Sequence, residues 1–185
     1  MIADPYAPPA ATLHDAAPTS PAFYVVSKSK FAMLFVATNG FYIAYWLYKN
    51  WKLHRAAGNK VLPLVRTIFG VFFIYSLFTR IDRRIKASGR EFRWFPRSLA
   101  LAFIVVACTS SAAVWIQDFH IQFAMSLLVL LLQIFCLLSA QAAINYSEND
   151  SEGHTNSALT FANGVWIGLG LCFWTLLFLT YFLLP

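Results

Sequence analysis

The chain has 185 residues, of which 59% are hydrophobic, 17% aromatic and only 12% charged. Soluble domains carry about 25% charged residues, so 14 Lys and Arg with 8 Asp and Glu are too few to cover a water-soluble domain of this size. The composition therefore predicts an integral membrane protein.

The net charge of +6 flanks apolar runs and does not accompany a nucleic-acid recognition module. Two lysines precede the first apolar run, four basic residues follow it, and seven lie between Arg80 and Arg97. This distribution predicts membrane topology and contact with anionic lipids, with no nucleic-acid partner. The three cysteines lie in three different apolar runs, which favours packing over redox or metal chemistry.

Residues 1–27 contain five of the eight prolines among alanines. Such a composition cannot build a core, so we expect a flexible tail and not a signal peptide. Residues 28–185 are predicted to form one membrane domain.

Five apolar segments follow the tail: 31–48, 61–79, 99–117, 121–145 and 158–184. The last three contain no Lys, Arg, Asp or Glu and approach the roughly 20 apolar residues that a spanning helix needs. The predicted fold is an all-α polytopic transmembrane bundle of four spanning helices, with 61–79 as a fifth spanning or re-entrant segment. Gly70 is the candidate break for re-entry.

The two readings of 61–79 differ at the N-terminus and at the loop 49–60. If the segment spans, the N-terminus is cytoplasmic and the loop is outside. If the segment re-enters, the N-terminus is outside and the loop is cytoplasmic. Both readings place 80–97 and 147–157 inside and the C-terminus outside.

Two stretches carry a family resemblance. TNGFYIAYWLYKNWKLH at 38–54 is followed by VLPLVRTIFGVFFIYSLFTRI at 61–81. The pattern T-x-G-x-Y-x-x-YW-x-YK-x-W, then a proline, an arginine and a Y-S-L-F ending, resembles a widespread family of uncharacterised bacterial integral membrane proteins. The resemblance implies a bacterial membrane location and no established activity, cofactor or substrate.

Aromatic residues gather after the first apolar run, namely Tyr42, Tyr45, Trp46, Tyr48 and Trp51. Their position beside lysines favours an interfacial aromatic belt, and the alternative is a cation–π cage for a quaternary ammonium group. Arg66 lies near the start of its segment, where its side chain is expected to reach back to the headgroups.

The segment 80–97 holds the candidate residues for anionic lipid or partner contact: Arg80, Arg83, Arg84, Lys86, Arg90, Arg93 and Arg97. The acidic turn 147–156 shares the predicted cytoplasmic face, so we expect the two to dock electrostatically. Arg83 and Arg84 would then couple with Glu148 and Asp150. The turn does not match the calcium-loop order, and no metal site is predicted.

Polar and small residues inside the segments are candidates for intramembrane contacts: Asn39, Gln133, Gln141, Asn145, Gly164 and Gly168. The amides are expected to hydrogen-bond neighbouring helices, and the glycines to allow close helix approach within the bundle or between copies.

No Asp, Glu or His falls inside the five segments, and no catalytic motif is present. The sequence thus predicts a non-enzymatic accessory, scaffolding or protective protein without a cofactor, acting through another membrane protein or itself. The alternative is a small channel or amphiphile transporter with a path lined by Asn39, Gln133, Gln141 and Asn145. An enzyme would need a site assembled from His54, Asp118 and His120.

Overall fold

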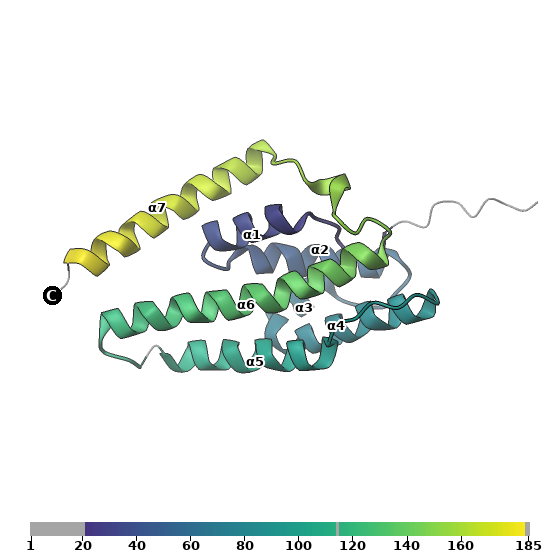
Figure 1. Cartoon of the computed structure of the whole chain (residues 1–185), viewed down its shortest axis with the longest axis horizontal. Coiled ribbons are helices and arrows are strands. Elements are labelled where there is room, and N and C mark those ends of the chain that lie inside the picture. Colours follow the sequence, from purple (N-terminus) through teal and green to yellow (C-terminus); the bar gives the residue numbers. More distant parts are fainter. Residues whose placement is uncertain (1–20, 114, 184–185) are drawn as a thin grey trace, which may run out of the picture.

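The computed structural model describes residues 21–113 and 115–183. All regular secondary structure in this part of the chain is helical, and no strands are present in it. The all-α prediction is confirmed. The helices are α1 Lys28–Ala37, α2 Tyr42–Ala56, α3 Pro63–Ile68, α4 Gly70–Ala87, α5 Pro96–Ala113, α6 Phe119–Ser147, the short 3-10 helix η1 His154–Asn156 and α7 Phe161–Leu183 (Figure 1).

Two helices are long and apolar enough to cross a membrane, α6 with 29 residues and α7 with 23. The apolar α5 is shorter. The expectation of four or five spanning helices is therefore too high for the described residues, because the first two predicted segments are each divided into two helices.

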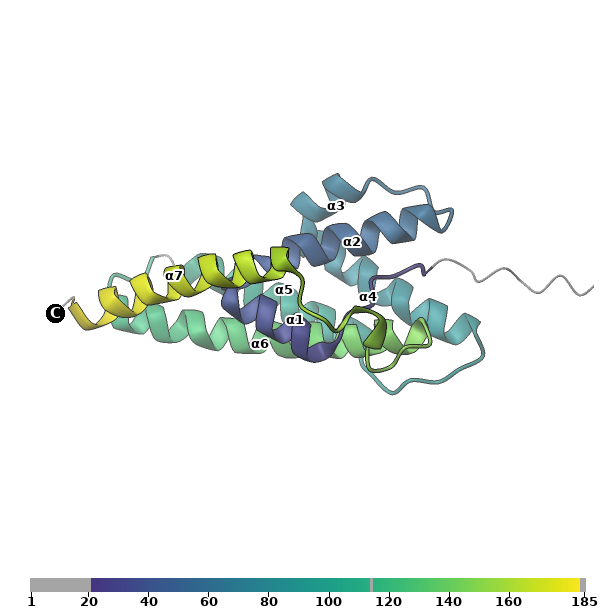
Figure 2. The same ribbon diagram turned by 90° about the horizontal axis from the view of Figure 1, so that it is seen from above.

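The segment 31–48 is divided after Ala37. Asn39 and Gly40 have positive φ angles of 48° and 86°, a conformation that ends a helix and that glycine adopts without strain. Ten residues give α1 a length of about 15 Å, half of a hydrocarbon core. The chain then reverses, and α2 runs back beside α1 (Figures 1 and 2).

The segment 61–79 is divided at Phe69, where α3 ends and α4 begins after a non-helical residue with ψ of 33°. The chain again reverses, as Figure 2 shows. Gly70 begins α4 against the end of the Leu47 side chain of α2, which would have to move to make room for a β-carbon at this position. The break thus falls at the predicted glycine, and 61–79 is not one continuous helix.

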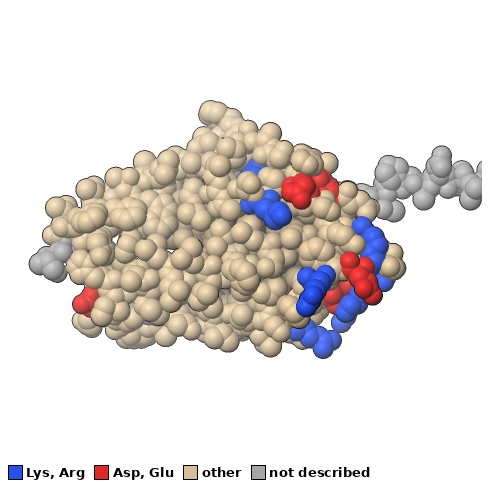
Figure 3. Space-filling view, viewed as in Figure 1, with Lys and Arg blue, Asp and Glu red and all other residues tan. Residues whose placement is uncertain are grey.

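These two reversals bring most connections to one end of the bundle. We define the charged end as the segment 22–27 and the connections 57–62, 88–95 and 148–160, with the helix termini that they join (Figure 1). The far end consists of the α5–α6 connection and the end of α7. All 14 Lys and Arg lie between residues 28 and 97, and Figure 3 shows the basic side chains of the visible face gathered toward the charged end.

The predicted tail 1–27 needs a correction at its end. Residues 1–20 lie outside the described residues, but Phe23 and Val26 belong to the hydrophobic core, with 1% and 0% of their surface exposed. The proline-rich composition on which the prediction rested ends at Pro21, and the following FYVV stretch is apolar enough to pack between helices.

α7 is the outermost long helix. Gly170 packs against the backbone of Ala37, and the Trp174 indole Nε1 donates a hydrogen bond to the Val36 carbonyl at 2.8 Å. Most other α7 side chains are exposed, including Phe161, Trp166 and Leu176. α7 is thus attached to the bundle along one narrow line.

Candidate functional site

Side-chain amides from two helices, α2 and α6, bind the extended segment 22–27. The Asn50 Oδ1 accepts from the Tyr24 amide at 3.0 Å, and the Gln141 Nε2 donates to the Tyr24 carbonyl at 3.1 Å. The Asn145 side chain makes two hydrogen bonds with the Val26 backbone. Its Oδ1 accepts from the Val26 N–H at 3.4 Å, and its Nδ2 donates to the Val26 carbonyl at 2.9 Å. Because an extended segment outside a sheet has no ladder partners, these amides satisfy its buried backbone groups.

The same amides also bind each other and α2. The Trp46 indole Nε1 donates to the Gln141 Oε1 at 2.6 Å, and the Gln141 Nε2 donates to the Asn145 Oδ1 at 2.7 Å. Trp46, Gln141 and Asn145 are fully buried. Gln141 and Asn145 therefore join α6 to α2 and to the N-terminal segment, and their polar atoms do not line an open path.

The other two intramembrane amides lie elsewhere. Gln133 is half-buried and has no side-chain hydrogen bond in the described part of the chain. Asn39 lies in the α1–α2 turn and lines a cavity of about 270 Å³ with Ser110, Gln122 and Ser126. The four amides of the predicted path are thus not brought together.

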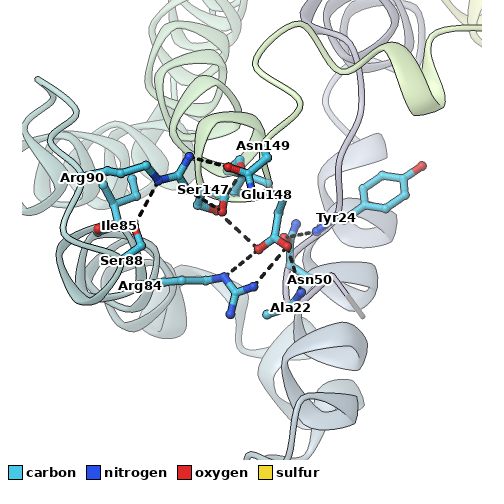
Figure 4. A network of polar contacts seen from close by, with 11 residues as sticks. Ala22, Tyr24, Asn50, Arg84, Ile85, Ser88, Arg90, Ser147, Glu148 and Asn149 are labelled. Carbon is cyan, nitrogen blue, oxygen red and sulfur yellow. Dashed lines mark hydrogen bonds and ion pairs between the residues drawn. The ribbon is translucent and has the colours of Figure 1, made fainter. Parts of the chain in front are cut away.

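Glu148 joins the acidic turn to the basic segment, as Figure 4 shows. Its carboxylate lies 2.9 Å from the Arg84 Nε and accepts from the Arg84 Nη2 at 3.3 Å and from the Ala22 amide at 3.2 Å. The side chain of Glu148 is 5% exposed and that of Arg84 is 37% exposed. The expected contact between the two segments is present, through Arg84 and Glu148.

Arg90 makes a second contact with this turn. It donates to the Asn149 Oδ1 at 2.6 Å and to the Ser147 carbonyl at 3.0 Å, and its guanidinium lies 4.8 Å from the centre of the Tyr146 ring (Figure 4). Asp150 does not pair with a basic residue here but accepts from the backbone of His154 and Thr155 within its own turn. These hydrogen bonds lower the pKa of Asp150 below its usual 3.8.

The remaining basic residues of 80–97 are placed as follows. Lys86 pairs with Asp82 one helical turn away, and Arg80 donates to the His54 Nε2 at 3.0 Å. Arg83, Arg93 and Arg97 are exposed and form no ion pair with another described residue. The charged end therefore keeps unneutralised positive charge on its surface.

His54 lies within this basic environment. It stacks on Phe23 with ring centres 5.4 Å apart and is 8% exposed. Burial, and then the guanidinium groups of Arg80, Arg66 and Arg84, lower the pKa of His54 from 6.5 to about 4. The imidazole is thus neutral at pH 7 and accepts from Arg80. Asp118 and His120 lie at the far end of the bundle, where Asp118 caps α6 by accepting from Ile121 and the centre of the His120 ring lies 4.6 Å from that of Tyr181, so they are not assembled into one site with His54.

The aromatic belt needs a correction for three of its five residues. Trp46 and Trp51 are fully buried, and Tyr42 is 8% exposed, because α2 packs into the bundle beside Phe31. Tyr45 and Tyr48 are exposed at 48% and 37%, and an interfacial role for these two stays a prediction.

Arg66 lies over two aromatic rings, with its guanidinium carbon 4.5 Å from the centre of Trp51 and 4.9 Å from that of Phe73. It lines a cavity of about 690 Å³ together with Arg55, Lys60 and the apolar residues Val61, Val65 and Phe73. The sequence indicated Arg66 but gave no signal that Arg55 of α2 and Lys60 of the loop 57–62 would line the same cavity.

Gly164 and Gly168 face open space, with no atom within 4 Å of where a side chain would begin. The close contact within the bundle is made by Gly170. Within the described residues, the G-x-x-x-G pair Gly164 and Gly168 therefore makes no close helix contact.

No protein-family model, curated protein or solved structure matches this chain. Its class is defined by its own features, an all-helical bundle with two helices capable of crossing a membrane and with its basic residues at one end. The bacterial family resemblance stays a prediction.

Proposed function

We propose that the protein is a multi-pass protein of a bacterial cytoplasmic membrane, with the charged end in the cytoplasm. In this topology α5, α6 and α7 span, and the pairs α1–α2 and α3–α4 enter from the cytoplasmic side and return to it. The segregation of all Lys and Arg before residue 98 supports this placement, since cytoplasmic loops carry the excess of basic residues. The N-terminus and the loop 57–62 are then cytoplasmic.

Within this membrane we propose a non-enzymatic accessory function, exerted through contact with a second copy of the chain along α7. The observation that carries it is the outward face of α7, where Gly164 and Gly168 are open while Gly170 on the opposite face holds the helix to α1. Small residues on a lipid-facing helix let a second backbone approach closely.

Two native cysteines allow a test in intact membranes. Cys172 on α7 and Cys108 on α5 are both exposed. We expect mild oxidation to crosslink a variant that keeps only Cys172 into a dimer, and to leave a variant that keeps only Cys108 monomeric. Gly168→Leu should abolish the crosslink, whereas Ala162→Leu, at an exposed position on another side of α7, should preserve it. Equal crosslinking by both cysteines would contradict the proposal.

A second candidate, binding of a membrane amphiphile, is favoured by the cavity beside Arg66. A continuous transport path is not part of this candidate, because the Gln141 and Asn145 side chains are bonded within the core. The test for transport is movement of a fluorescent lipid across proteoliposomes, where we expect the same rate with and without the protein.

A further inference from the structure

We propose that the cavity formed by Arg55, Lys60 and Arg66 binds the phosphate of an anionic phospholipid, whose acyl chains lie along α3. The inference rests on the proposed membrane placement, because it requires the loop 57–62 to lie at the cytoplasmic headgroup level. It does not depend on the α7 contact.

The charge of the cavity selects an anion. Three of its lining residues are cations, and none is acidic. Arg66 also keeps an unsatisfied donor, since its buried Nη1 atom has no hydrogen-bond partner. The Arg66 side chain as a whole is half-buried, and arginine matches phosphate oxygens in two-point contacts.

Arg66 is held in position by aromatic residues, not by an acid. Trp51 is fully buried in the core, and Phe73 belongs to α4, so the guanidinium lies between two elements of the bundle. Such contacts orient the side chain without neutralising it. Its charge therefore remains available to a ligand, and its orientation is set before the ligand binds.

The apolar surroundings select a lipid over a free anion. Val61, Val65 and Phe73 line the same cavity as the cations. From there α3 presents a continuous exposed apolar surface, with Leu64 63% and Ile68 69% exposed, followed by Phe72 at 77%. A phosphate beside a strip of this kind has the chemistry of a phospholipid: a charged group bound by cations and hydrocarbon chains lying on apolar side chains.

The experiment uses the full chain in a neutral detergent and measures thermal unfolding while short-chain phosphatidylglycerol or phosphatidylcholine is titrated in. A ligand that binds only the folded protein raises its unfolding temperature. We expect phosphatidylglycerol to raise the unfolding temperature in a saturable manner and phosphatidylcholine to do so only at much higher concentration.

The variants test the site itself. Arg55 and Lys60 are exposed, so the pair Arg55→Gln and Lys60→Gln should fold normally. Removing a cation near a lipid phosphate should weaken binding about fivefold for each charge. The control pair Lys28→Gln and Lys52→Gln removes two exposed cations that do not line the cavity, and it should leave the affinity unchanged. Equal losses in the two pairs would overturn the site, because they would show attraction to the whole basic surface.

Two further measurements are needed. One tests whether inorganic phosphate can replace the lipid, and the other tests the membrane topology independently of lipid binding. Inorganic phosphate alone should not reproduce the stabilisation; if it does, the ligand is a free anion and the lipid assignment is wrong. A cysteine placed at Ala57 should be labelled only from the cytoplasmic side. Labelling from outside would contradict the topology, whereas correct labelling without a phosphatidylglycerol response would contradict the lipid site alone.

Discussion

The burial of the α1–α2 pair and of α7 is the reverse of what the hydrophobicity of their residues predicts for a water-soluble protein. α7 contains no charged residue, yet it lies outermost and is mostly exposed. α2 contains Asn50, His54 and two tryptophans, and these are buried in the centre. In the proposed membrane setting, lipid is as apolar as leucine, so burial follows shape and hydrogen bonding. The most polar intramembrane residues therefore mark the core, and uninterrupted apolar surface marks contact with lipid.

The largest expected effect comes from removing one of the buried side-chain amides. Asn145→Leu would leave the Val26 N–H and carbonyl without partners and would deprive Gln141 of an acceptor. We expect unfolding free energy to fall by about 3 kcal/mol, since each unsatisfied buried group costs about 1–3 kcal/mol.

The matched control for this variant is Gln133→Leu, on the same helix but without a side-chain hydrogen bond to another described residue. Its stability should change by less than about 0.5 kcal/mol. Chemical unfolding in detergent measures both. Similar losses in the two variants would show that the central amides do not determine packing.

Acidification tests the neutral state of His54 in the same core. The unfolded chain takes up a proton on this histidine near pH 6.5, and the folded protein does so only at about 4. Because the unfolded state binds the proton first, stability is full above pH 6.5 and falls as the pH decreases, by up to about 3 kcal/mol near pH 4.

Unfolding between pH 7.5 and 4.5 avoids most carboxylate titration and should show this decrease. His54→Gln should remove most of the pH dependence, and His154→Gln, at an exposed position, should retain it. A pH dependence that survives His54→Gln would assign it to other groups.

The attachment of α7 can be tested with two glycines on opposite faces. Gly170→Ala places a methyl group into the Ala37 carbonyl, and we expect a loss of about 2 kcal/mol. Gly168→Ala meets no other atom of the chain within 4 Å, so in protein dispersed as monomers in detergent it should stabilise the helix by up to about 1 kcal/mol through propensity. Thermal unfolding of both, with labelling of Cys172 as the local readout, distinguishes them. A neutral Gly170→Ala would mean that α7 is not held at this contact.

The smallest expected effect concerns the ion pair at the charged end. Arg84→Glu with Glu148→Arg should show a coupling of about 1 kcal/mol in a double-mutant cycle, reduced because Arg84 is 37% exposed. Arg83→Glu with Asp150→Arg should show almost none, since Asp150 binds its own turn. Coupling in the second pair equal to the first would indicate a general charge effect.

The candidate site was only partly predictable from sequence. Arg66 could be selected because an ionisable residue in an apolar run is unusual. Arg55 and Lys60 could not be joined to it, since that juxtaposition depends on the connection 57–62, which reverses the chain so that α3 packs against α2. Gln141 and Asn145 were correctly identified as polar members of one helix, but their bonds to Tyr24 and Val26 connect residues 117 and 119 positions apart. Hydrogen bonds between residues so far apart in the sequence cannot be predicted from local sequence patterns.

The sequence by itself determined that the chain is helical, where α5, α6 and α7 lie, and that all of its Lys and Arg residues come before residue 98. These properties follow from local composition and from the length of apolar runs. The tertiary structure decided that the first two apolar segments double back, and that residues 22–27 enter the core. The physical reason is that a turn such as Asn39–Gly40 permits a reversal locally, but only distant partners, the central amides and the packed tryptophans, determine which way the returning helix lies.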